Sequence, residues 1–191
     1  GEIKGVKGPD KFLPHLMGHE GYASVLDVGP GVKNVEIGDK VVLHWRKGSG
    51  IESPTPKYQW KGKTLNAGWI TTFNTHAIVS ENRCTKIPET TSPELAALFG
   101  CAITTGFGVV ENNASIKMGE SVVVFGAGGV GLNIIQAASL YSAWPIIAVD
   151  LFDSRLELAK QLGATHLINS NNCNAEENIK KLLDSQLLDV F

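Results

Sequence analysis

The sequence has little cysteine, little excess charge and no long apolar run, and each shortage excludes a class of protein. Three cysteines in 191 residues are too few for a disulfide framework, so we expect a reducing compartment, the cytoplasm. The 17 Lys and Arg against 19 Asp and Glu give a formal charge of −2, which argues against nucleic acid or an anionic membrane as a partner. No run approaches the roughly 18 apolar residues of a membrane span.

The sequence also lacks an initiator methionine and the apolar segment of a signal peptide. It begins in a charged, glycine-bearing stretch, Gly1–Lys11, and it ends over 187–191 in residues typical of a buried strand that is just beginning. We therefore expect a window cut from a longer chain.

The first half of the sequence predicts a small, barrel-like β domain. Apolar segments at Gly21–Val28, Lys40–Leu43 and Gly68–Ser80 are bounded by glycine, proline and charge, as short strands between turns are. A long polar loop is expected over Arg46–Asn66. A hydrophobic fraction of 43% supports a folded core rather than disorder.

The second half predicts a parallel sheet, because strands and helices alternate along the chain. Helices are expected from Ser92-Pro93, a capping residue followed by proline, and over Thr104–Asn113. The expected strands are Val122–Phe125, Ile146–Val149, His166–Ile168 and a fourth from Asp189, and the expected helices between them are Gly131–Leu140, Asp153–Leu162 and Ala175–Leu183.

Glycine is abundant, with 21 residues, and the most informative cluster is Gly126–Gly131, which fits the pattern G-x-G-x-x-G. Gly126 allows a tight turn, Gly128 lets a pyrophosphate approach the backbone, and Gly131 lets the helix pack on the strand. The helix N-terminus offers free N–H groups and a positive dipole end to phosphate. The candidate cofactor-binding residues are Gly126, Gly128, Gly129, Val130, Gly131 and Asp150.

Asp150 follows the next strand, at the position of the acid that binds the adenosine ribose. An acid there would repel a 2′-phosphate, which favours NAD over NADP. The alternative is a tight strand–helix turn that binds no ligand.

His19 and Cys101 are candidate metal ligands, but they lie far apart and show no local ligand spacing such as C-x-x-C. A lone histidine is commonly structural, and a lone cysteine on an apolar helix is commonly a small core residue. From the residues alone, metal binding by this pair stays open.

Taken together, the motifs resemble the zinc-dependent medium-chain alcohol dehydrogenases. The matching pieces, in family order, are the GHE segment 14–20, the Gly-Asp-Lys-Val segment 28–41, Gly100–Gly106 with its cysteine, Gly126–Gly131 and Asp150. The resemblance covers nearly the whole chain. It implies an incomplete GroES-like, mainly β catalytic domain over 1–105 and an incomplete NAD-binding Rossmann domain over 106–191.

The resemblance also implies a role for each matching residue. His19 and Cys101 match two ligands of the catalytic zinc, and Glu20 matches the acid behind that site. Thr105 matches the residue that packs against the nicotinamide. Trp45 falls where the family places a bulky aromatic residue in the alcohol pocket, and a Trp there would favour slim primary alcohols or aldehydes; an aromatic cap on the barrel end is the alternative.

Two departures from the family pattern are visible. The family's first zinc ligand is a cysteine upstream of the GHE motif, and no cysteine precedes His19 in this sequence. The family's structural zinc lobe needs four closely spaced cysteines, and the segment 46–68 has none. We therefore expect one catalytic zinc, lacking its first ligand in this chain, no structural zinc, and little or no activity for residues 1–191 alone.

The function implied by the resemblance is hydride transfer between an alcohol, primary or polyol, and NAD, giving an aldehyde or ketone, in a parent protein that is a homodimer or homotetramer. The expected partner is a small alcohol or aldehyde, with no nucleic acid and no membrane. One alternative is a zinc-independent, NADPH-dependent quinone or enoyl reductase of the same superfamily. The other is a nucleotide-binding module without catalysis.

Overall fold

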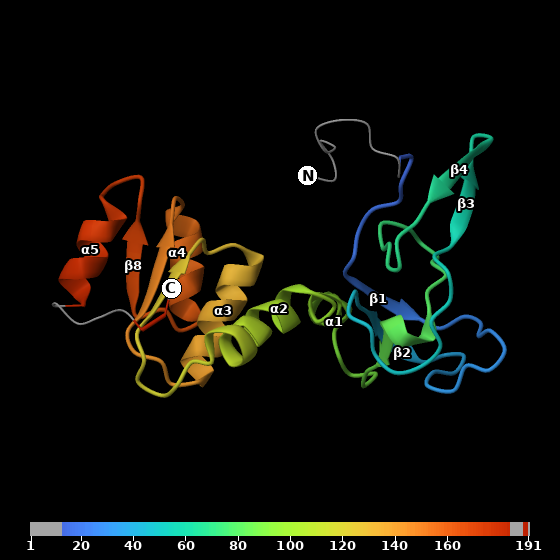
Figure 1. Ribbon diagram of the computed structural model, residues 1–191, viewed down its shortest axis with the longest axis horizontal. Coiled ribbons are helices and arrows are strands. Elements are labelled where there is room, and N and C mark those ends of the chain that lie inside the picture. Colours follow the sequence, from blue (N-terminus) through green and yellow to red (C-terminus); the bar gives the residue numbers. More distant parts are fainter. Residues whose placement is uncertain (1–12, 184–188, 191) are drawn as a thin grey trace. The chain divides into compact units, whose positions relative to one another are not determined.

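The computed structural model describes residues 13–183 and 189–190. The chain divides into an N-terminal unit that ends at Cys101 and a C-terminal unit that begins at Ala102 (Figure 1). The division falls shortly before the expected domain boundary at 105/106, because helix α2 (Ala102–Gly108) packs against helix α3 (Gly129–Leu140) of the C-terminal unit.

The N-terminal unit is built on an antiparallel sheet of three short strands, ordered β1-β2-β5. These strands are β1 (Gly21–Ser24), β2 (Lys40–Leu43) and β5 (Cys84–Lys86). The central strand β2 is buried along Val41–Leu43, as its β-branched and apolar residues predict. Val41, Leu43 and Ile70 form a small apolar cluster.

The structure corrects two expectations about the N-terminal unit. The expected polar loop 46–66 contains a hairpin, β3 (Lys57–Trp60) and β4 (Lys63–Asn66), closed by Lys61 and Gly62, which both have positive φ. Positive φ at both central residues suits the twist of a two-residue hairpin turn. The expected strand at 68–80 does not form; within this segment Thr72 and Phe73 both donate to the Met17 carbonyl instead of continuing a strand ladder.

Helix α1 (Pro93–Leu98) ends the N-terminal unit and begins where the sequence predicts. The hydroxyl of Ser92 accepts a hydrogen bond from the Leu95 N–H at 3.3 Å, which satisfies one of the free donors of the first turn. The short 3-10 helix at Glu81–Arg83 precedes β5, and all three of its residues are buried.

The C-terminal unit is the parallel α/β fold that the alternation predicts. Its sheet has the order β6-β7-β8 and consists of β6 (Val122–Phe125), β7 (Ile146–Asp150) and β8 (His166–Asn169). Val190 forms a parallel bridge with Val122, on the side of β6 away from β7. This bridge lies at the start of the expected fourth strand, and Phe191 lies outside the described residues.

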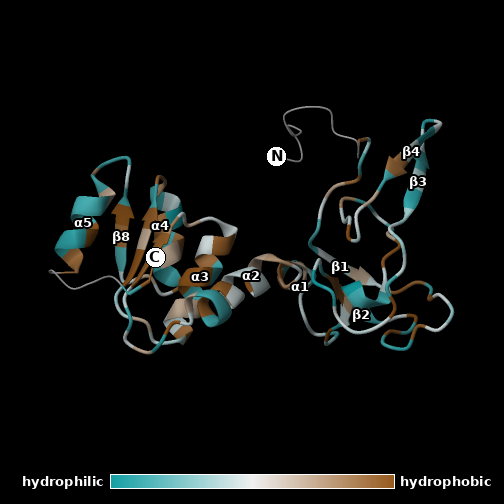
Figure 2. Cartoon of the chain, in the orientation of Figure 1, coloured by the Kyte–Doolittle hydropathy of each residue, from teal (hydrophilic) through white to brown (hydrophobic). Residues whose placement is uncertain are grey.

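Helices connect and cover these strands, as parallel pairing requires. They are α3, α4 (Asp153–Gln161) and α5 (Ala175–Leu182), with a π-helical turn at Val109–Ala114 after α2. The sheet residues are strongly apolar and α5 is largely hydrophilic (Figure 2). In the described part of the chain, no helix combines the length and the hydropathy that crossing a membrane would require.

Candidate functional site

The glycine-rich turn joins β6 to α3 in the C-terminal unit, and glycine is required at two of its positions. Gly126 has a φ of +93°, a conformation that side chains other than glycine rarely adopt. A Cβ atom on Gly131 would overlap the Gly126 carbonyl oxygen. The turn therefore brings the first turn of α3 directly against the end of the strand.

Two other glycines of the turn face open space. A Cβ atom on Gly128 or Gly129 would meet nothing within 4 Å, and Val130 is 40% exposed. The N-terminal end of α3 is thus accessible beside a bare backbone, as phosphate binding requires. Ligand binding by this turn stays a prediction.

Asp150 lies at the end of β7, where its carboxylate accepts hydrogen bonds from the backbone of the glycine-rich turn and of the residues after β7. Oδ2 accepts from the Ala127 N–H at 2.7 Å, and Oδ1 accepts from the Phe152 N–H at 3.0 Å. Burial acts to raise the pKa of Asp150, but these N–H groups and the nearby Arg155 guanidinium hold the pKa below its usual value. Asp150 is therefore charged and holds the backbone of the turn, a role that the sequence alone did not suggest; the ribose contact stays a prediction.

Thr105 lies on α2, which packs closely on α3. A Cβ atom on the neighbouring Gly106 would be 2.5 Å from the Asn133 Cβ and within 2.9 Å of the α3 backbone at Ile134. Thr105 itself is exposed. The helix that carries Thr105 is thus fixed, through Gly106, to the helix that opens at the glycine-rich turn.

The segments that carry His19 and Cys101 meet in the N-terminal unit. A Cβ atom on Gly100 would lie 2.5 Å from the Leu43 carbonyl oxygen and 3.4 Å from the Glu20 Cα. Gly100 thus lets the end of α1 approach β1 and β2 closely. The structure places the residue before Cys101 against the residue after His19, although 82 positions separate the two candidate ligands in the chain.

This pair does not by itself complete a zinc site. Across residues 13–183 and 189–190, no three His, Cys, Asp or Glu side chains gather in a way that could hold a metal ion. A catalytic zinc commonly takes three protein ligands. The described residues therefore do not fit a closed zinc site, and metal binding by His19 and Cys101, with Glu20 behind them, stays a prediction.

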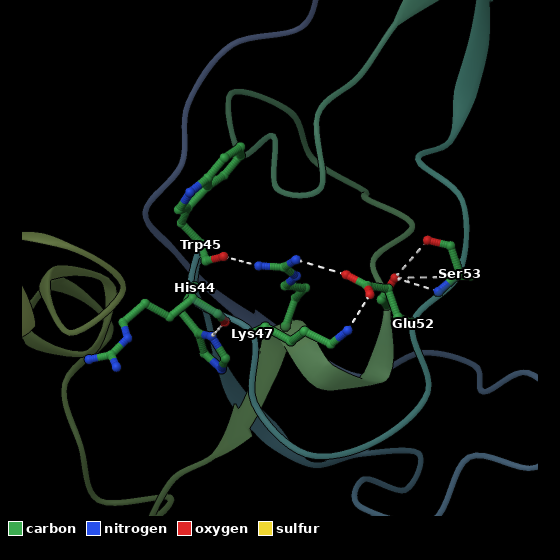
Figure 3. A network of polar contacts seen from close by, with 8 residues as sticks. His44, Trp45, Lys47, Glu52 and Ser53 are labelled. Atoms are coloured by element: carbon green, nitrogen blue, oxygen red, sulfur yellow. Dashed lines mark hydrogen bonds and ion pairs between the residues drawn. The ribbon is translucent and has the colours of Figure 1, made fainter.

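Trp45 belongs to a polar network that the sequence did not reveal (Figure 3). The buried guanidinium of Arg83 donates to the Trp45 carbonyl and, through its other terminal nitrogen, to Glu52 Oε1 at 2.9 Å. Lys47 pairs with the other oxygen of Glu52 at 2.5 Å. These contacts hold the pKa of Glu52 below its usual value, with Lys47 the largest cause.

A second tryptophan joins this network from a different segment. The Trp69 ring lies 5.4 Å from that of Trp45, centroid to centroid, and the Arg83 guanidinium lies 4.7 Å from the Trp69 ring centroid. Sequence reasoning missed Arg83, Glu52 and Trp69. The one available signal was composition, since three of the four tryptophans in the chain fall between 45 and 69.

Glu81 anchors the loops around this network. Its carboxylate accepts from the backbone N–H groups of Lys33 at 2.6 Å, Asn34 at 2.7 Å and Ile51 at 2.7 Å. These three bonds, that from Ile51 foremost, lower the pKa of Glu81. One buried carboxylate thereby connects two loops that are distant in sequence.

Comparison with known families matches both halves of the chain. Residues 2–89 match the alcohol dehydrogenase GroES-like domain, and residues 129–191 match the zinc-binding dehydrogenase family. Among curated relatives, the S-(hydroxymethyl)glutathione dehydrogenase of Synechocystis sp. is 34% identical over 186 residues, which is 84% of this chain and 50% of the relative. That of Photobacterium damsela subsp. piscicida is 34% identical over 189 residues, with coverages of 86% and 51%.

Solved structures agree with these matches. The benzyl alcohol dehydrogenase of Acinetobacter calcoaceticus has a TM-score of 0.78 at 34% identity, covering 92% of this chain and 54% of the other. An alcohol dehydrogenase zinc-binding domain protein from Burkholderia ambifaria has a TM-score of 0.76 at 34% identity, covering 89% and 53%. The chain therefore spans about half the length of the relatives it matches.

Proposed function

Because the chain belongs to the zinc-dependent medium-chain alcohol dehydrogenase family, we propose that the complete protein carrying it transfers a hydride between an alcohol and NAD. The observation that carries this proposal is the turn at Gly126–Gly131. Two of its glycines permit the close strand–helix packing, and two others leave the helix N-terminus open to a phosphate.

We propose the N-terminal unit as part of the GroES-like catalytic domain and the C-terminal unit as part of the Rossmann domain, with the boundary near 105/106. In this assignment Gly128, Gly129 and Val130 bind the pyrophosphate, and Asp150 selects NAD over NADP by repelling a 2′-phosphate. Thr105 packs against the nicotinamide. When bound, NAD supplies the hydride acceptor, while the chain binds and orients the cofactor.

His19 and Cys101 are proposed as two ligands of a catalytic zinc, with Glu20 behind them. The described residues do not complete that site. The N-terminal unit places the two candidate ligands near each other, because Gly100 lets the segment that carries Cys101 pack closely against the segment that carries His19. Trp45 is proposed to line the alcohol pocket, and the complete protein is proposed to act on a small alcohol or aldehyde as a homo-oligomer.

The test is an assay of the complete purified protein for reduction of NAD by ethanol, benzyl alcohol and S-(hydroxymethyl)glutathione, with NADP in parallel. We expect alcohol-dependent NADH formation and little with NADP. Oxidation of NADPH by a quinone, without alcohol oxidation, would instead identify the zinc-independent reductase. NAD binding without turnover of any alcohol would identify a nucleotide-binding module.

Gly128→Ala provides a matched control for the role of the turn. Its Cβ atom enters open space, so the unfolding free energy should change by less than about 0.5 kcal/mol. The same methyl group stands where the pyrophosphate is proposed to approach, so affinity for NAD should fall. Unchanged NAD affinity in this variant would count against the proposed cofactor site.

A further inference from the structure

Trp45 and Trp69 form a pair of aromatic rings that contact each other yet remain open to solvent. Their centroids lie 5.4 Å apart with an interplanar angle of 54°, a tilted arrangement within the favourable range for aromatic pairs. Trp45 is 50% exposed and Trp69 is 40% exposed. About half of each large apolar side chain is therefore available to a further group.

The pair is held in place from within the N-terminal unit by one buried cation. Arg83, whose side chain is only 5% exposed, lies 4.7 Å from the Trp69 ring centroid and donates to the Trp45 carbonyl. A planar guanidinium packs well against an aromatic ring. Arg83 thereby fixes the backbone of Trp45 and packs against the ring of Trp69, which in turn contacts the ring of Trp45. These contacts reduce the conformational freedom that is lost when a ligand packs against the pair.

The strand register brings Trp45 toward the segment that carries His19. β1 and β2 are antiparallel with Gly21 opposite Leu43. The chain before β1, which carries His19, and the chain after β2, which carries Trp45, therefore leave this sheet at the same end.

The segment that carries Trp69 lies along the same stretch of chain. Thr72 and Phe73 donate to the Met17 carbonyl at 3.2 and 3.0 Å. A Cβ atom on Gly68 would lie 3.9 Å from the Trp45 ring and 4.0 Å from His15 Nε2. Segments 15–19, 43–45 and 68–73 therefore converge within the N-terminal unit, with the two indoles among them.

From this convergence we infer that Trp69 acts with Trp45 as a specificity-determining pair that favours flat, aromatic primary alcohols, in place of the slim primary alcohols expected from Trp45 alone. The inference rests on the proposed function and extends it by naming the substrate class. An aromatic ring gains an offset or edge-on contact with an indole in addition to apolar burial, whereas a short aliphatic alcohol such as ethanol gains neither. Trp69 determines preference, and Arg83 is a positioning residue that acts through both tryptophans.

The test compares kcat/KM for benzyl alcohol with that for ethanol in the complete protein and in three variants. Trp69→Ala should lower the benzyl-to-ethanol ratio by about three- to ten-fold, which is the range expected for one lost aromatic contact. Trp69→Phe, which restores a ring, should recover most of the ratio. Trp60→Ala is the matched control, since Trp60 is 51% exposed on the β3–β4 hairpin and is not part of the Trp45–Trp69 pair. The benzyl-to-ethanol ratio of this variant should equal that of the unmodified protein.

A second readout keeps this inference separate from the proposed function. Benzyl alcohol should quench tryptophan fluorescence saturably in the unmodified protein and in Trp60→Ala, and much more weakly in Trp69→Ala. Absence of oxidation of either alcohol would remove the proposed function, and the fluorescence titration would still decide the role of Trp69. An unchanged ratio in Trp69→Ala, or quenching equal to that of the unmodified protein, overturns the inference.

Discussion

The two units of this chain bury different kinds of group. Around the parallel sheet, the C-terminal unit buries a large apolar cluster that includes Ile135, Ile146 and Ala148. The apolar cluster of the N-terminal unit has only three buried members. Of the buried polar and charged residues in the described part, five lie in the N-terminal unit, namely Thr71, Ser80, Glu81, Asn82 and Arg83, and two lie in the C-terminal unit, Ser121 and Asp150.

This difference shows that the two units depend on different forces. The C-terminal unit, with its glycine-rich turn, is specified by apolar packing and by glycines that let backbones approach, which are local features of the chain. The N-terminal unit, with the candidate ligands and tryptophans, is specified by side chains that bind distant backbone groups. Buried polar groups stabilise a fold only while they are hydrogen-bonded, so the N-terminal unit should be sensitive to the loss of single charged residues.

The largest effect should come from breaking the glycine packing of the C-terminal unit. In Gly131→Ala the new methyl group overlaps the Gly126 carbonyl oxygen, so the turn or the helix must shift. We expect a loss of about 3 kcal/mol in the free energy of unfolding, measured by urea denaturation of the complete protein, together with loss of NAD binding. For stability, Gly129→Ala is the matched control, because its Cβ meets nothing within 4 Å; equal losses of unfolding free energy in both variants would refute the packing argument.

The corresponding change in the N-terminal unit removes its buried cation. Arg83→Met keeps a long side chain but leaves the Trp45 carbonyl and the Glu52 carboxylate without this donor. Because Glu52 is 34% exposed, water compensates in part, and we expect a loss of about 2 kcal/mol. Arg46→Met, an exposed arginine nearby, should cost less than about 0.5 kcal/mol. If Arg83→Met destabilises the protein no more than Arg46→Met does, apolar packing governs the N-terminal unit as well.

The same contrast explains what could be predicted from the sequence. The elements of the C-terminal unit match the expectations to within a few residues, because alternating strands and helices and the glycine turn are local patterns. Strand β2 and the start of α1 were also predicted, from an apolar run and from the Ser92-Pro93 cap.

The rest of the N-terminal unit depends on long-range contacts that no local pattern encodes. The β3–β4 hairpin depends on positive φ at Lys61, and lysine gives no signal for that conformation. Arg83 reaches Glu52 across 31 positions, and Glu81 reaches Lys33 across 48. Glu52 therefore falls within the expected polar loop 46–66, and its contact with the buried Arg83 emerges only in the folded structure.

A smaller effect should separate the structural role of Asp150 from its proposed ligand role. In Asp150→Asn one of the two N–H groups held by the carboxylate, Ala127 or Phe152, loses its acceptor. We expect a loss of about 1 kcal/mol in urea denaturation and weaker NAD binding by calorimetry. Asp153→Asn changes an exposed carboxylate on the following helix, which accepts from the Asn169 side chain, and should cost less. Unchanged stability in Asp150→Asn would show that the turn does not need the carboxylate.

The smallest effect concerns the reactivity of Cys84, which tests whether water is excluded from the interior of the N-terminal unit. Burial, followed by the nearby charge of Glu81, raises the pKa of the Cys84 thiol from 9.0 to about 11. At about pH 8 only roughly one Cys84 thiol in a thousand is then ionised, so alkylation by iodoacetamide should be far slower at Cys84 than at the exposed Cys173. Peptide mass spectrometry resolves the two sites, and both should react alike in urea. Because the pKa of the Cys84 thiol is higher in the folded protein than in the unfolded chain, the contribution of this thiol to the free energy of unfolding is complete below pH 9.0. It is lost as the pH rises toward 11. Comparable rates at both cysteines in the folded protein would mean that water enters the N-terminal unit, and that its buried charges are solvated rather than held by their hydrogen bonds.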